Sequence, residues 1–190
     1  YWRRDHSFCM AALWAAVLLA LVATVALAAP VGGEEENPMA RSDGSVWVIP
    51  VRGTIDLGLS AYVERAVRQA ADAGAVLILV ELNTFGGRVD AATEIRDTLV
   101  GSGLPTAAFV GERAWSAGAL IALAADTLWM APGSSIGAAQ PVPADEKTVS
   151  ALRAEFEATA ERTGRDPKIA AAMVDANVAI DGLVAAGEIL

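Results

Sequence analysis

The sequence predicts an α/β domain built on a largely parallel β-sheet. Three observations support this fold class: four short apolar runs lack helical periodicity, amphipathic helical patterns separate them, and the connections are short. With 190 residues and 54% hydrophobic content, the chain can form one domain with a substantial core. Periodicity alone is equally compatible with an ordinary doubly wound sheet.

The predicted strands are short and strongly apolar. The first is rich in β-branched residues, and the second is apolar apart from Glu81. The second run is too short for a helix, which favours a strand buried on both faces of a parallel sheet. The four strands are expected at residues 46–51, 76–82, 106–110 and 127–130.

The predicted helices differ in how much of their surface is apolar. The first has apolar residues on one side, charged residues on the other, and Gly74 at its end. The third is apolar almost all round and must therefore be buried. Helices are expected at residues 59–73, 90–99, 116–125 and 145–163, and a further one begins at Pro167, a favoured first helical position.

The N-terminal residues 1–29 are typical of a targeting segment. Arg3 and Arg4 precede an uncharged apolar run, and Ala26-Leu27-Ala28 resembles a signal-peptidase cleavage site. A cleaved signal peptide is the preferred interpretation, and a retained membrane anchor is the alternative. Either places the rest of the chain outside the cytoplasm, because the arginines stay inside. Residues 30–45 are predicted to form an acidic, flexible linker.

Composition excludes several classes of function. The net charge is −9 and Lys147 and Lys168 are the only lysines, so no basic patch could bind nucleic acid. The single cysteine, Cys9, cannot form an internal disulfide. The sequence has no Cys/His cluster and no phosphate-binding glycine loop, so neither a metal site nor a nucleotide cofactor is predicted.

Two motifs about thirty residues apart indicate acyl-transfer chemistry. Gly86-Gly87 follows a strand and can expose backbone N–H groups to a carbonyl oxygen, while Ser116 lies between a strand and an Ala/Gly-rich helix. Oxyanion donors and a nucleophilic hydroxyl together form such a site. The N–H of Ala117 would be a second donor. The structural alternatives are a plain turn for the glycines and a helix N-cap for Ser116.

Ser116 also needs a general base. The only histidine, His6, lies in the targeting segment, so a Ser-His-Asp triad is excluded and lysine remains. A lysine acts as a base only where burial or a nearby positive charge lowers its pKa. Lys147 is the preferred candidate and Lys168, beyond the long helix, is the poorer one. The alternatives are a solvated surface role for Lys147 and a base from a neighbouring subunit.

Residues 46–173 resemble the N-terminal protease domain of the NfeD-type membrane-bound serine proteases, members of the ClpP/crotonase superfamily related to signal peptide peptidase A. The resemblance implies a fold of stacked β-β-α units, Ser116 as nucleophile, and Gly86 and Gly87 as oxyanion donors. It also implies that the protease domain at 46–190 is C-terminally truncated. The matching pieces are residues 48–56, Gly86-Gly87, residues 114–118, residues 130–142 and Gly164-Arg165.

The resemblance further implies a membrane-associated homo-oligomer, a dimer or larger, with an extracytoplasmic catalytic domain. Its substrates would be hydrophobic segments of stomatin- or flotillin-like membrane proteins. The chain departs from the family at Phe85, where a proline is common, and at Glu157, seven residues before Gly164, where archaeal members carry the lysine base. Lys147 stands near the helix start, where bacterial relatives tend to carry a lysine.

Two other functions remain compatible with the sequence. One is a catalytically inactive scaffold of the same fold that binds membrane-associated partners, which the glutamate at position 157 supports. The other is a crotonase-type acyl-CoA enzyme, which the export signal disfavours because acyl-CoA chemistry is intracellular.

Overall fold

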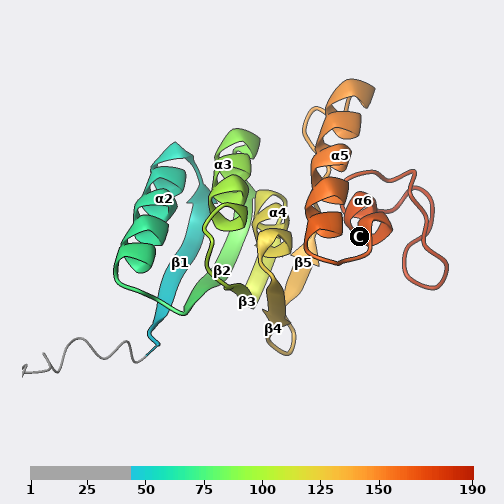
Figure 1. Ribbon diagram of the computed structural model, residues 1–190. Helices are drawn as coiled ribbons and strands as arrows, with labels where there is room; N and C mark the ends of the chain where they lie inside the picture. The colour runs from blue at the N-terminus through green and yellow to red at the C-terminus, as the bar shows by residue number, and fades with distance from the viewer. Residues whose placement is uncertain (1–43) are drawn as a thin grey trace, which may run out of the picture. The chain divides into compact units, whose positions relative to one another are not determined.

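The computed structural model describes residues 44–190 (Figure 1). The targeting segment predicted for residues 1–29 lies outside this range, as does the predicted linker apart from its last two residues. The elements in chain order are β1 (Val46–Ile55), α2 (Leu57–Asp72), β2 (Leu77–Gly87), α3 (Val89–Val100), β3 (Thr106–Trp115), α4 (Ala117–Ala124), β4 (Thr127–Met130), β5 (Ser135–Gly137), α5 (Glu146–Arg162) and α6 (Pro167–Ala172).

These elements confirm the predicted parallel α/β architecture. The sheet has the strand order β1-β2-β3-β4, and β5 pairs with the C-terminal end of β3. All of these strand pairs are parallel. The carboxyl ends of β2, β3 and β5 therefore meet at one edge of the sheet, which is where ligands bind in open α/β folds.

The core lies between the sheet and the helices α2, α3 and α4, which share one face of it (Figure 1). Residues of β2 alternate between partly exposed and buried positions, as the period of two in a strand requires. Every residue of α4 is buried, as its apolar composition predicts. In this way α4 is held against β2 and β3, with its first turn at the carboxyl edge of the sheet.

The strands that form the site are longer than the periodicity predicts. β2 continues through Gly87 and β3 through Trp115, because ladder pairing persists there, with Thr84 opposite Ala114. The Gly-Gly pair is thus a strand end. Among the described residues, no helix is both long enough and apolar enough to span a bilayer.

Candidate active site

Ser116 occupies the junction between β3 and α4 in a strained backbone conformation. Its φ is 52° and its ψ is −120°, a region that residues with a side chain rarely adopt. The backbone N–H donates to the Gly137 carbonyl at 2.8 Å, which fixes the turn. Within residues 44–190, the Ser116 hydroxyl makes no capping hydrogen bond although Ser116 holds the N-cap position. The conformation thus presents the hydroxyl instead of using it as a cap.

Gly86 leaves the space that Ser116 occupies. Its φ is 105°, which strongly favours glycine. A Cβ at Gly86 would lie 2.7 Å from the Ser116 Cβ, 3.2 Å from its Oγ and 3.0 Å from the Trp115 carbonyl oxygen. The two motifs identified in the sequence are therefore in direct contact.

Thr84 connects the parts of this edge, and the sequence motifs did not identify it. Its buried hydroxyl donates to the Gly53 carbonyl at 2.6 Å and accepts the Gly86 N–H at 2.9 Å. Its methyl group packs against Gly118, where an added Cβ would lie 2.5 Å from Thr84 Cγ2. Thr84 thereby joins β1, the Gly-Gly segment and the first turn of α4. The available signal was a single polar residue at a buried position, just before two glycines.

The backbone N–H groups at this edge differ in their availability. The Gly86 N–H is bonded to Thr84, and the Arg88 N–H donates to the Ile55 carbonyl at 2.8 Å. The Gly87 N–H lies between these two bonded groups in the chain. Ala117 is the first residue of α4, where N–H groups have no partner within the helix.

The two candidate lysines lie on different helices, α5 and α6. Lys147, exposed near the start of α5, lines a cavity of about 490 Å³ together with Val89, Thr93 and Leu152. Val89 begins α3 and follows Gly87 by two residues in the chain. Lys168 is exposed on α6.

Glu157 occupies the middle of α5 and is partly exposed. Its carboxylate lies 3.9 Å from Arg153 Nε, one turn earlier in the same helix. Glu157 thus belongs to a charged group on α5.

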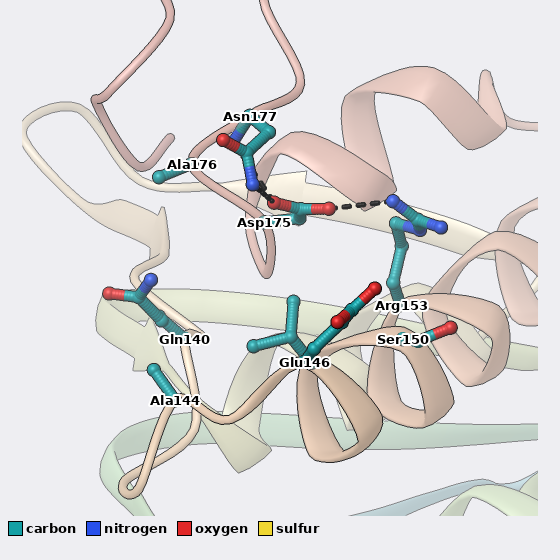
Figure 2. A pocket seen from close by; sticks show the side chains of 9 residues that line it. Gln140, Ala144, Glu146, Ser150, Arg153, Asp175, Ala176 and Asn177 are labelled. Carbon is teal, nitrogen blue, oxygen red and sulfur yellow. Dashed lines mark hydrogen bonds and ion pairs between the residues drawn. The ribbon is translucent and has the colours of Figure 1, made fainter.

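A second cavity, of about 420 Å³, is lined by Gln140 after β5, by residues of α5 and by the segment after α6 (Figure 2). On one side Arg153 Nη1 lies 2.6 Å from the carboxylate of Asp175, which is almost fully buried. Hydrogen bonds from the backbone and side chain of Asn177, together with Arg153, hold the pKa of Asp175 below its usual range. The ion pair joins α5 to the segment after α6. In that segment, the Met173 carbonyl accepts a hydrogen bond from the Ala139 N–H. Ala139 follows Gly137, whose carbonyl holds the Ser116 N–H, by two residues.

This arrangement is suited to acyl transfer. A presented serine hydroxyl in contact with a Gly-Gly segment places a nucleophile beside backbone N–H groups, as such a reaction needs. No group of three or more His, Cys, Asp or Glu side chains that could hold a metal ion occurs in the described part of the chain.

The family model of the NfeD1b N-terminal domain matches residues 45–190. The chain belongs to this family. Membrane protein NfeD1b of Bacillus subtilis is 42% identical over 139 residues, covering 70% of the chain and 32% of that protein. Membrane-bound protease PH1510 of Pyrococcus horikoshii is 30% identical over 167 residues, covering 81% of the chain and 36% of that protein. The chain thus spans about a third of the length of these relatives.

Solved structures agree with this assignment to the NfeD1b domain family. A serine-to-alanine variant of a membrane-bound stomatin-specific protease, 1510-N, superposes with a TM-score of 0.65 and 30% identity, covering 68% of this chain and 69% of that one. A lysine-to-alanine variant in complex with a substrate peptide gives 0.67 and 29%, covering 70% and 67%. ClpP1 from Listeria monocytogenes, at 0.55 and 21%, covering 65% and 76%, shows that the fold is ClpP-like.

Proposed function

We propose that this NfeD1b-family domain is a serine endopeptidase with Ser116 as its nucleophile. The conformation of Ser116 carries the proposal, because a strained strand-to-helix turn that presents a hydroxyl is the geometry of a nucleophile elbow. The comparisons support it, since a relative is described as a stomatin-specific protease and was solved as serine and lysine variants.

The proposed reaction assigns each group a role. Ser116 Oγ attacks the peptide carbonyl carbon as its proton passes to Lys147 Nζ, and the carbonyl oxygen becomes an oxyanion. The N–H groups of Gly87 and Ala117 stabilise that oxyanion. The lysine proton then goes to the leaving amine as the C–N bond breaks, and water hydrolyses the acyl-enzyme. Gly86, whose N–H is bonded to Thr84, contributes clearance for the serine rather than a donor.

In this proposal, the bound substrate shields Lys147 from water. A general-base lysine must lose water contact, and Lys147 is exposed in the structure. An apolar substrate residue in the cavity lined by Val89 and Leu152 would remove that water. Lys168 or a lysine from a neighbouring subunit of a homo-oligomer is the alternative base.

The proposed substrates are hydrophobic segments of stomatin- or flotillin-like membrane proteins. A relative's description as stomatin-specific, and its complex with a substrate peptide, support this class. We further propose that the catalytic domain is tethered at the membrane on its extracytoplasmic side. The descriptions of both curated relatives as membrane proteins, and the apolar N-terminal run, support that location.

A second candidate function is a catalytically inactive scaffold that binds the same partners. Glu157 and the exposure of Lys147 favour it, because a serine without a usable base is not activated.

Peptide hydrolysis by the full chain separates the two functions. Apolar decapeptides labelled at both ends are incubated with wild type, Ser116→Ala and Ser134→Ala, the last being a serine in the turn after β4 that serves as the matched control. We expect cleavage by wild type and Ser134→Ala but not by Ser116→Ala, while all three remain folded by circular dichroism. Hydrolysis by pure, folded Ser116→Ala would refute the nucleophile. An inactive wild type that Glu157→Lys activates would establish the scaffold.

A further inference from the structure

Two aromatic side chains flank the candidate nucleophile and remain open to solvent. Phe85 directly precedes Gly86, and Trp115 directly precedes Ser116. Phe85 is 66% exposed and Trp115 is 37% exposed. Consecutive Cα atoms are about 3.8 Å apart, so both rings start within one residue of the Gly86–Ser116 contact.

The two rings form a fixed cluster with the side chains around them. Their centroids lie 5.4 Å apart in an edge-to-face arrangement, a favourable geometry for aromatic pairs. The Arg113 guanidinium lies 4.5 Å from the Phe85 centroid and 5.8 Å from the Trp115 centroid. Trp115 Nε1 donates to the Ser135 hydroxyl at 2.7 Å. We call Phe85, Trp115 and Arg113 the aromatic cluster.

Phe85 lies on the side of β2 opposite to Thr84 and Gly86. Thr84 and Gly86 are buried on the helix-covered side of β2, while Phe85, between them, is exposed. The Ser116 Oγ faces Gly86. A peptide bound in extended form at the serine presents successive side chains to opposite sides. One side chain next to the scissile bond would therefore point toward the aromatic cluster.

We propose that the aromatic cluster is a specificity subsite that binds a bulky apolar side chain, aromatic or large aliphatic, next to the scissile bond. The inference rests on the proposed peptidase function and adds the residues that select the substrate. The chemistry follows from the exposed rings, since burying an aromatic or aliphatic side chain against them is favourable. The guanidinium of Arg113 lies against the rings and 3.2 Å from the Glu112 carboxylate, so its charge already has a partner.

The test measures peptide binding to the full chain carrying Ser116→Ala, so that it does not require hydrolysis. The probes are fluorescein-labelled Gly/Ser decapeptides with one valine, a small aliphatic residue, to fix the register and a phenylalanine moved through each neighbouring position, plus one without phenylalanine. Dissociation constants come from fluorescence anisotropy. We expect one phenylalanine position to bind at least about tenfold more tightly than the peptide without it.

Phe85→Ala in that background should abolish this preference, so that the preferred phenylalanine peptide binds within about twofold of the peptide without phenylalanine. Trp115→Phe, which keeps a ring, should retain it. Trp129→Ala is the matched control, because Trp129 is 53% exposed but lies on β4, away from the site edge. Preference that survives Phe85→Ala, or the absence of any preferred position, would overturn the subsite. If wild type cleaves no peptide but this preference is found, the peptidase proposal fails and the subsite stands.

Discussion

Replacing Gly86 by alanine tests the contact on which the candidate active site depends. The new methyl group would sit 2.7 Å from the Ser116 Cβ, whereas carbon atoms in contact normally lie about 3.5–4.0 Å apart. Either Ser116 or the end of β2 must move by roughly 1 Å. The residue would also have to keep φ near 105°, a conformation that costs about 1–3 kcal/mol when a side chain is present.

The expected loss of unfolding free energy for Gly86→Ala is therefore about 2–4 kcal/mol, most of it strain and clash. A displacement of about 1 Å at a catalytic group can reduce the rate about 100-fold, so kcat/KM should fall at least that much. Urea denaturation and peptide hydrolysis measure the two effects.

Gly103→Ala is the matched control for this substitution. Gly103 has φ 70°, but nothing lies within 4 Å of an added Cβ. Gly103→Ala should lower the free energy of unfolding by only about 1–2 kcal/mol and keep full activity. If Gly86→Ala resembles Gly103→Ala in both stability and hydrolysis, the proposed contact between the two motifs is wrong.

Three further predictions concern Thr84, Asp175 and Lys147. Thr84→Val should lower the free energy of unfolding by about 2–3 kcal/mol, because it leaves the buried Gly86 N–H without its partner. A loss of less than about 0.5 kcal/mol in urea denaturation would contradict this. Asp175→Asn should lower the free energy of unfolding by about 2 kcal/mol at pH 7, where the lowered pKa of Asp175 stabilises the fold. The difference from wild type should shrink as the pH falls below about 4, because the wild-type carboxylate is then protonated. A pH-independent difference in Tm would contradict the ion pair with Arg153. Lys147→Ala should reduce kcat at least about 100-fold and Lys147→Arg should fail to restore it, because a guanidinium stays protonated; unchanged rates for Lys147→Ala, or a comparable loss in the control Lys168→Ala, would reject Lys147 as the base.

The alternation of strands and helices could be predicted because burial leaves a period in the sequence. Ile95 and Leu99 are buried on α3 as their spacing predicts, and the wholly apolar α4 is wholly buried. The full lengths of β2 and β3 could not be predicted, because glycines and polar residues interrupt their apolar runs. Pairing between distant segments, such as Thr84 with Ala114, extends the ladder there.

The site was predictable in its motifs but not in its connections. Ser116 and Gly86 could be selected by their places after strands, yet their contact depends on the parallel register. The backbone angles of Ser116 depend on the Gly137 carbonyl, which comes from a three-residue strand too short to leave a period. Thr84 was missed for a similar reason, since its partners Gly53 and Gly118 lie far from it in sequence.

Covalent trapping tests the central proposal, that Ser116 is an activated nucleophile, most directly. The full chain is incubated with a fluorophosphonate carrying an apolar tail, digested, and the modified residue is located by mass spectrometry. A single adduct on Ser116 is expected, with none in Ser116→Ala and a much slower reaction in Lys147→Ala. A wild-type chain that hydrolyses peptides while Ser116 stays unmodified and another residue carries the adduct would contradict the proposal.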